Sequence, residues 1–487
     1  MGAGADGAGA RQLVKEKEER GDDESEEDDD MAQAYDSDIE RELEADAAAL
    51  REQEPEDEHM KLAAQDRARA DAAGWTTLVL PPSEFQPSDN GEFKPDEALS
   101  LDFVHGYRGW DCHGNLVFTI TQEFVYFAAS VAVIMDPQTR RQKHYLGPPN
   151  RPAGEIQSLA LHPGGSIVAT AERGLSPAIL IWDISTLATL RELKEGHTGG
   201  VTAMAFSKDG KRLVSAGMDA AHTVMVWEWK NEKKNTPLCS VSLKTAKIFC
   251  LGYNPADDVI VAGGSAMIEF MRVGLSRTGQ RTLEHLPGVF AVSNRATHDV
   301  SPTMLSVAFT QTEFSLSSTL KNAIEGLCLT GSDIGNIYLW KREEQMDMIV
   351  SAHKSSVYAL ASFVNGFCSG GKDGKVKLWN NDLEALGSFD ICAAAQQSLS
   401  IRALDQKGGK IIIGTTSSDI LLLDQDSGEV EALVRGHKLG AVHAVAAHPT
   451  KPLYASVGDD GVLKLWDIGQ CPNSRPAPLR PGEREEG

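Results

Sequence analysis

Short apolar runs alternate with polar positions from residue 99 onward, and Gly, Asn and Asp residues separate these runs. Alternation of this kind, with every second side chain apolar, is typical of β-strands that bury one face. The clearest runs end at Trp182, Trp379 and Trp466. The pattern therefore predicts an all-β body of many short strands, in which the 45 Gly residues supply tight turns.

The Trp residues that end these runs recur at a nearly constant spacing. Trp182 and Trp227 are 45 positions apart, and Trp340 and Trp379 are 39 positions apart. From Trp379 to Trp466 the spacing is 87 positions, which leaves room for two units. A period of about 40–45 residues with a terminal Trp is typical of four-stranded propeller blades. We count seven units over residues 154–468 and predict a WD40-type β-propeller.

One interval is too long for this period. Trp227 and Trp340 are 113 positions apart, which corresponds to two units and an insertion. The first of the two units ends near residues 268–270, so the excess falls in residues 275–303. Because additional length must lie outside stacked strands, we expect a long surface loop there.

Polar residues recur in phase with the Trp residues. Two distant units carry a Ser ten positions and an Asp six positions before their Trp: Ser369, Asp373 and Trp379, and Ser456, Asp460 and Trp466. A His opens three of the units: His197, His353 and His437. These types resemble the buried hydrogen-bonded set of WD-type repeats, which satisfies each polar atom inside a blade. Metal ligation by the His residues and general-base roles for the Asp residues are alternatives, but recurrence in register favours structural roles, as it does for Trp182, Trp227 and Trp340.

A more specific pattern precedes the repeats, in residues 104–116, 126–131 and 142–147. Its characteristic positions are Gly106, Tyr107, Arg108, Gly109, Asp111, Asn115, Tyr126 and Tyr145. In order and spacing, these segments resemble the hydrophobic HELP motif of the echinoderm microtubule-associated protein-like (EML) family. The resemblance extends over residues 99–468. It implies an N-terminal HELP-motif unit packed on the propeller, in which Tyr107 packs against the body and Arg108 pairs with a nearby acid. A partner site at residues 106–109 is the alternative.

The resemblance also implies a function. It points to a microtubule-associated, non-catalytic binding platform for tubulin, microtubules or axonemal components. The expected location is the cytoplasm and cytoskeleton, including the axoneme or the spindle. The alternative is a generic WD-repeat adaptor, for example a ubiquitin-ligase substrate receptor or a scaffold in a signalling complex.

The formal net charge of −23 is concentrated at one end of the chain, because residues 1–72 hold 25 Asp and Glu against 9 Lys and Arg. We interpret this segment as a disordered or partly helical tail. Ser25 and Ser37 are flanked by acids and are candidate phosphosites for acid-directed kinases. The remaining predicted divisions are a Pro-rich linker at 73–98, the HELP motif at 99–150, the repeats at 151–470 and a disordered tail at 471–487.

Several classes of function find no support in the sequence. No basic patch favours nucleic acid, and no apolar run approaches the length of a membrane span. The seven Cys residues form no CxxC pair, which indicates reduced thiols rather than a disulfide framework or a zinc site. No phosphate-binding loop or G-x-S-x-G element is present. We therefore expect no catalytic residues, no cofactor, no metal and no small-molecule substrate.

Overall fold

The computed structural model describes the part of the chain that the repeat pattern covers. The described residues are 100–467 except 150, 152, 175, 195, 232–234, 244–246, 291–300, 312–325, 396 and 439–441. The predicted tails 1–72 and 471–487 and the linker 73–98 lie outside them. All described strands belong to the second of two compact units, Asp102–Gly487.

Seven four-stranded antiparallel sheets and one three-stranded sheet are formed by the described residues. The motif sheet consists of β1 (Val117–Phe118), β2 (Phe124–Ala128), β3 (Val131–Met135) and β4 (Gln142–Tyr145). The next three sheets are β5 (Ile156–Leu161), β6 (Ile167–Glu172), β7 (Ile179–Asp183) and β8 (Thr189–Leu193); β9 (Val201–Phe206), β10 (Leu213–Gly217), β11 (Thr223–Trp227) and β12 (Cys239–Ser242); and β13 (Ile248–Tyr253), β14 (Val259–Gly264), β15 (Met267–Leu275) and β16 (Arg281–Pro287).

The remaining sheets follow in chain order. They are β17 (Met304–Phe309), β18 (Cys328–Ser332), β19 (Ile337–Lys341) and β20 (Glu344–Ile349); β21 (Val357–Phe363), β22 (Gly366–Gly371), β23 (Lys375–Asn380) and β24 (Ala385–Asp390); β25 (Ile401–Lys407), β26 (Lys410–Thr415), β27 (Ile420–Asp424) and β28 (Val430–Val434); and β29 (Val442–Ala447), β30 (Leu453–Gly458) and β31 (Leu463–Asp467). A short helix, α5 (Ile391–Ala395), connects β24 to β25.

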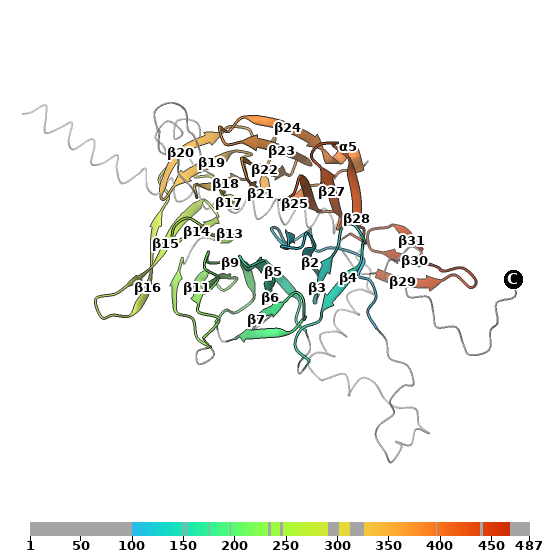
Figure 1. Cartoon of the computed structure of the whole chain (residues 1–487), viewed down its shortest axis with the longest axis horizontal. Coiled ribbons are helices and arrows are strands. Elements are labelled where there is room, and N and C mark those ends of the chain that lie inside the picture. The colour runs from blue at the N-terminus through green and yellow to red at the C-terminus, as the bar shows by residue number, and fades with distance from the viewer. Residues whose placement is uncertain are drawn as a thin grey trace, which may run out of the picture. The chain divides into compact units, whose positions relative to one another are not determined.

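The seven four-stranded sheets form a closed ring (Figure 1). Their first strands lie side by side in the order β5, β9, β13, β17, β21 and β25. The motif sheet fills the seventh place, because β1 contacts β25 and β2 contacts β5. This arrangement confirms the predicted all-β propeller but changes its composition. The motif unit, expected to pack on a propeller of about seven repeat units, is itself one of the seven ring sheets.

Apolar clusters between neighbouring sheets hold the ring together. Val376 of β23, for example, is fully buried against Ile401 and Ile413 of the next sheet. At the closure, Tyr126 of β2 packs with Ile412 of β26. Each large side chain removed from water in this way contributes about 1.5–3 kcal/mol. Ring sheets therefore bury both faces, one against the preceding and one against the following sheet, whereas the alternating pattern predicted one buried face; strands such as β10 and β14 are buried along their whole length.

The three-stranded sheet β29–β31 lies outside the closed ring (Figure 1). All six residues of β29 are exposed. Val457, Leu463 and Leu465 share one face of the sheet and are 38%, 63% and 71% exposed. The opposite face is partly covered, because the His105 ring lies 4.2 Å from the Trp466 ring, measured between centroids.

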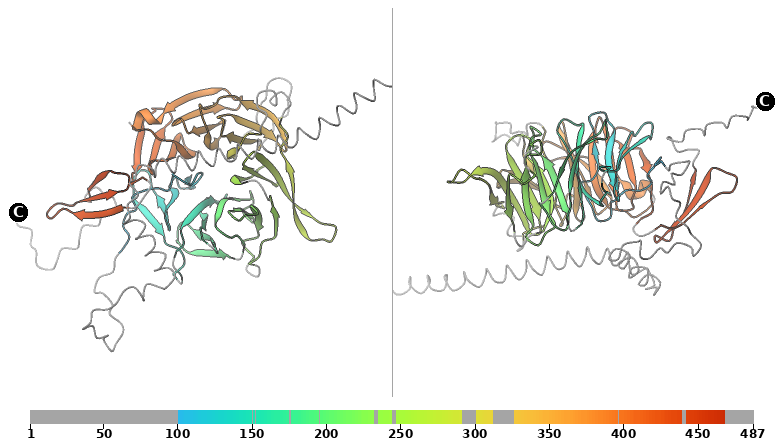
Figure 2. Two further views of the ribbon diagram at one scale, coloured as in Figure 1. Left: turned by 180° about the vertical axis from the view of Figure 1, so that it is seen from behind. Right: turned by 90° about the horizontal axis from the view of Figure 1, so that it is seen from below.

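The predicted loop over residues 275–303 is wrong in part. Residues 281–287 form strand β16, which pairs with β15 from Glu269↔Pro287 to Leu275↔Arg281. Part of the excess length therefore extends a hairpin of the blade, which projects beyond the edge of the ring (Figures 1 and 2). Backbone hydrogen bonds across the ladder satisfy the polar groups that a loop would leave to water. Residues 291–300 lie outside the described residues.

Candidate functional site

The repeated polar residues meet inside the sheet β21–β24. The indole N–H of Trp379 donates to the Ser369 hydroxyl at 2.8 Å, and the same hydroxyl lies 2.8 Å from His353 Nε2. His353 Nδ1 contacts the Asp373 carboxylate at 2.9 Å. Burial opposes ionisation of Asp373, but hydrogen bonding from His353 holds its pKa below the usual value. The four side chains form one chain of hydrogen bonds in which every buried polar atom has a partner.

The same chain recurs completely in the sheet β29–β31 and in part in the sheet β9–β12. In β29–β31, His437 contacts Ser456 at 2.8 Å and Asp460 at 3.0 Å, and Trp466 donates to Ser456 at 2.7 Å. In β9–β12, His197 and Trp227 contact Ser215 at 2.7 and 2.9 Å. There Asp219 stands 3.6 Å from His197 Nδ1 and makes no hydrogen bond with it. The two additional residues before Trp227 lengthen the turn and move the carboxylate away.

Trp182 and Trp340 bind a Thr hydroxyl in place of a Ser hydroxyl. The position of each Thr in the sequence, ten or twelve residues before the Trp, could have predicted this contact. Their indole N–H groups donate to the hydroxyls of Thr170 at 3.3 Å and Thr330 at 2.8 Å. Thr330 stands ten positions before Trp340, the offset that Ser369 has from Trp379. A hydroxyl in strand two thus receives the indole N–H in five sheets among the described residues.

The Asp–His–Ser order also occurs in acyl-transfer catalysis, where a His activates a Ser nucleophile. Here the Ser369 side chain is 0% exposed, and its hydroxyl accepts the Trp379 N–H. A nucleophile must reach the substrate carbonyl, which this position inside the sheet prevents. The arrangement stabilises a blade and has no access for a substrate.

Arg108 of the HELP motif connects the motif sheet to the next sheet. Its side chain is 5% exposed, and the guanidinium binds Asp111 through two hydrogen bonds, at 2.8 and 2.5 Å. It also contacts the Glu155 carboxylate at 2.6 Å and the Ile156 carbonyl at 2.9 Å. Bidentate Arg–carboxylate pairs are among the stronger charge-assisted hydrogen bonds. Arg108 is therefore engaged within the ring, at the entry to β5.

Tyr107 and its neighbours connect the motif sheet to the sheet on its other side, β25–β28. The buried Tyr107 hydroxyl donates to the Asn115 side chain, and Asn115 donates to the Arg108 carbonyl at 2.6 Å. The backbone of Gly109 passes so close to β26 that a Cβ would fall 2.0 Å from the Thr415 carbonyl oxygen. These contacts hold the HELP motif between the sheet β25–β28 and the sheet β5–β8.

Other motif residues contribute to the same packing. Tyr145 stacks on Trp182 with ring centroids 4.4 Å apart, and its hydroxyl lies 2.7 Å from the Thr189 hydroxyl. Gln142 donates to the buried Tyr126 hydroxyl at 3.0 Å. Gly106 has a φ of +111°, a conformation that favours glycine, and a Cβ there would lie 3.8 Å from the Gly436 Cα.

Residues 113–118 of the HELP motif contact the inner strands of other sheets, and the sequence did not predict these contacts. His113 Nε2 donates to the Phe249 carbonyl of β13 at 2.9 Å. Desolvation and the nearby Arg402 charge lower the pKa of His113 to about 4. Asp405 of β25 accepts the backbone N–H of Phe118 at 2.7 Å, and burial raises the pKa of Asp405 to about 6. No repeat offset marks either residue, because both contacts depend on ring closure.

A cavity of about 370 Å³ lies among these inner strands. Its lining includes His113, Ser158, Phe249, Ser306 and Asp405. Within the described residues, no group of three or more His, Cys, Asp or Glu side chains is placed to hold a metal ion. Six Cys residues in this part of the chain are free thiols.

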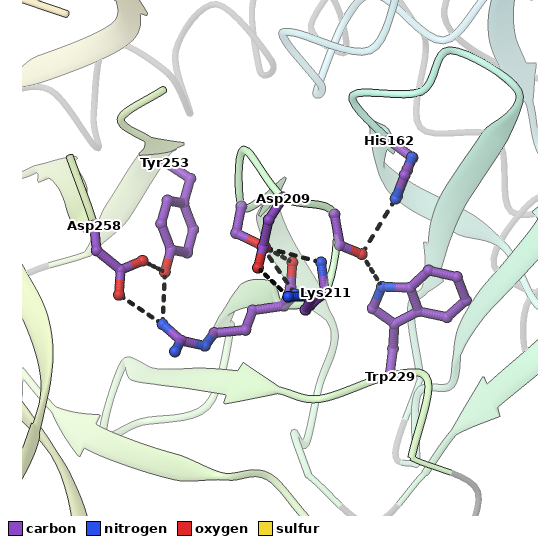
Figure 3. A network of polar contacts seen from close by, with 9 residues as sticks. His162, Asp209, Lys211, Trp229, Tyr253 and Asp258 are labelled. Atoms are coloured by element: carbon purple, nitrogen blue, oxygen red, sulfur yellow. Dashed lines mark hydrogen bonds and ion pairs between the residues drawn. The ribbon is translucent and has the colours of Figure 1, made fainter. Parts of the chain in front are cut away.

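Polar contacts also link neighbouring sheets at the turns (Figure 3). His162 and Trp229 both donate to the Gly210 carbonyl, at 3.2 and 2.8 Å. In the same network, Arg212 contacts Asp258 at 2.7 Å, and the Tyr253 hydroxyl donates to Asp258 at 2.5 Å. The turns of three consecutive sheets are thereby cross-linked.

No helix in the part of the chain that the structure describes is long and apolar enough to cross a membrane. The candidate phosphosites Ser25 and Ser37 lie outside the described residues.

Comparison with protein-family models and curated proteins identifies similar sequences. A model described as the echinoderm microtubule-associated protein first β-propeller matches residues 141–423, the HELP motif model matches residues 94–133, and a WD domain G-β repeat model matches residues 428–467.

Curated relatives agree with these models. The 77 kDa echinoderm microtubule-associated protein of Strongylocentrotus purpuratus is 30% identical, over 82% of this chain and 56% of that protein. Echinoderm microtubule-associated protein-like 1 of Homo sapiens is 30% identical, over 78% of this chain and 44% of that protein. The chain thus spans about half the length of the curated relatives that it matches.

Proposed function

Because the chain belongs to the echinoderm microtubule-associated protein family, we propose that it binds microtubules or tubulin through its propeller and acts as a non-catalytic platform. The observation that carries this proposal is the match of the propeller model over residues 141–423, since the relatives are named for association with microtubules. The same reasoning supports a cytoskeletal location.

The geometry supports a binding role for the outer surface of the ring. Arg108 and Tyr107 are buried and paired within the protein, so these motif side chains are not available to a partner. A ring with locked sheets presents its turns and edges at fixed positions, which lowers the entropic cost of binding. Tubulin is therefore expected to contact turns and projecting hairpins.

Cosedimentation with taxol-stabilised microtubules tests the proposal. The full chain should pellet with microtubules at low ionic strength and stay in the supernatant without them. A chain in which the buried Trp379 is replaced by Ala is a control for binding by unfolded protein, because it perturbs the ring. Absence of pelleting at low salt would argue against direct binding.

The acidic tail provides a second arm of the same experiment. Tubulin has an acidic outer surface, so a tail with 25 acids against 9 bases should repel it. Residues 73–487 alone should therefore bind more tightly than the full chain, and Ser25→Asp/Ser37→Asp more weakly. These differences should shrink as salt screens the charges. Equal binding by all three would indicate a passive tail.

The adaptor function remains a second candidate because of one observation. The sheet β29–β31 exposes Leu463 and Leu465, at positions that ring sheets use for contact with a neighbouring sheet. A large exposed apolar surface is typical of a protein interaction site. Affinity purification in which a ligase or signalling complex dominates and tubulin is absent would favour this function.

A further inference from the structure

The hairpin β15–β16 differs from its counterparts in the ring by its length and its position. β15 has nine residues and stays paired with β16 to Leu275↔Arg281. The far part of the hairpin projects beyond the edge of the ring, where a large partner can reach it from several sides (Figures 1 and 2).

The turn at the tip is held by hydrogen bonds. The Ser276 N–H donates to the Gln280 carbonyl at 2.8 Å, and the Gly279 N–H donates to the Ser276 carbonyl at 2.9 Å. Gly279 has a φ of +78°, which glycine adopts without the steric cost of a Cβ. A defined turn presents its side chains in one arrangement, so binding at the tip orders few additional groups.

The tip carries positive charge on an acidic protein. Arg277 and Arg281 are exposed, and the ion pairs found within the described part of the chain include neither of them. Arg272 is partly neutralised by Asp257, 3.4 Å away. No acid occurs in the sequence between Glu269 and Glu284. The formal net charge of the whole chain is −23, so this patch has the opposite sign.

An exposed apolar side chain accompanies the charges. Leu275 is 64% exposed and stands directly across the ladder from Arg281. Exposed Arg and a neighbouring Leu suit an acidic protein surface that offers carboxylates around an apolar contact, because Arg pairs with carboxylates in a bidentate geometry.

We propose that the β15–β16 tip is the contact through which this protein binds an acidic protein surface, and that in the proposed function this surface belongs to tubulin. The inference rests on the proposed function for the identity of the partner. The two arginines attract the acidic lattice over about 10 Å at 0.1 M salt, and Leu275 packs after contact. The attraction opposes the repulsion that we expect from the tail.

The test is cosedimentation of the full chain and Arg277→Glu/Arg281→Glu across a salt series. The substitution should weaken microtubule binding by about tenfold at low salt, because two attractive exposed contacts become repulsive. The difference should vanish at high salt. Polyglutamate should displace the wild-type protein from microtubules more effectively than it displaces the variant. A melting curve identical to that of the wild type shows that the ring is intact.

Lys208→Glu/Lys211→Glu is the matched control. These lysines are exposed on the turn between β9 and β10 of the neighbouring sheet, and their reversal changes the net charge by the same amount. Lys211 lies 3.4 Å from Asp209, so an unchanged melting curve is required of this variant as well. The control should bind nearly as tightly as the wild type. An equal loss in control and tip variant, or no loss in the tip variant, overturns the assignment of the tip while microtubule binding stands. Failure of the wild type to pellet overturns both the proposed function and this inference.

Discussion

The sheets β21–β24 and β29–β31 carry the same buried signature in different surroundings. In both, a Trp donates to a Ser that contacts a His, which in turn contacts an Asp, with distances of 2.7–3.0 Å. Yet Val376, three positions before Trp379, is 0% exposed, whereas Leu463, three positions before Trp466, is 63% exposed.

The difference separates two sources of stability. The Trp–Ser–His–Asp hydrogen bonds join residues of one repeat unit, so they form both in a sheet inside the ring and in a sheet outside it. Burial of the flat faces requires a sheet on either side, and only the ring supplies both. Because apolar burial is the dominant favourable contribution to folding, the ring should hold most of the stability of the described region.

Removal of whole segments should produce the largest effect. A chain without residues 1–150 lacks the motif sheet, so β5 loses its contact with β2 and β25 loses its contact with β1, and the ring is open. Such a chain should be insoluble or lack a cooperative unfolding transition. A chain that ends at Gly436 lacks β29–β31 and should keep the transition of the ring. Differential scanning calorimetry and solubility measure both outcomes, with removal of residues 1–72 as a soluble control. Soluble, folded 151–487 would contradict the closure of the ring by the motif sheet.

Equivalent Trp substitutions should give the next largest difference. Trp379→Ala should destabilise the ring by about 3–5 kcal/mol, as large-to-small core changes do. Trp466→Ala should leave the main transition nearly unchanged, because Trp466 packs outside the ring. Chemical denaturation monitored by circular dichroism gives both values. Equal losses would mean that β29–β31 unfolds together with the ring.

A milder pair of substitutions addresses the sheet faces alone. Val376→Thr keeps the shape of the side chain but places a hydroxyl in an apolar contact, at a cost of about 1–3 kcal/mol. Leu463→Thr changes an exposed residue, and the effect should stay within about 0.5 kcal/mol. The same denaturation experiment compares them. A cost at Leu463 as large as that at Val376 would reveal a partner on the exposed face in solution.

The smallest expected effect is the pH dependence of stability that comes from His113 and Asp405, two side chains where the motif sheet closes the ring. The folded pKa of His113, about 4, lies below its ordinary 6.5, so its contribution to stability is present above pH 6.5 and lost as the pH falls toward 4. The folded pKa of Asp405, about 6, lies above its ordinary 3.8, so its contribution is present below pH 3.8 and lost as the pH rises toward 6. Each group alone changes stability by at most about 1.4 kcal/mol per pH unit.

Two variants separate these opposing contributions. Relative to the wild type, His113→Gln should become less stable as the pH rises from 4 to 6, and Asp405→Asn should become more stable over the same range. Denaturation midpoints at several pH values measure both slopes. The chain that ends at Gly436 should retain them, because both groups lie in the ring. Parallel profiles for all proteins would show that neither group titrates as the closure geometry implies.

Local repetition was sufficient to predict the blades. Five Trp residues identified the third strand of five sheets: apart from the insertion before Trp340, their intervals fit one or two periods of 39–45 positions, and a Ser and an Asp recur at the same offsets in two units. The HELP motif was recognised in another way, by the resemblance of its residues to the family pattern in order and spacing. The loop predicted at residues 275–303 failed because an extended hairpin needs no additional repeat signal.

From the sequence follow the all-β class, the count of seven repeat units over 154–468 and the Trp that ends the third strand in five of them, since these depend on periods of two and about forty residues. Tertiary structure alone decided that the motif sheet takes the seventh place in the ring and that the last repeat stays outside it. The physical reason is that ring closure depends on contacts between residues hundreds of positions apart, such as Phe118 with Asp405. Such contacts carry no periodic signal, so the same signature at Trp379 and Trp466 gives no indication of which sheet will be buried.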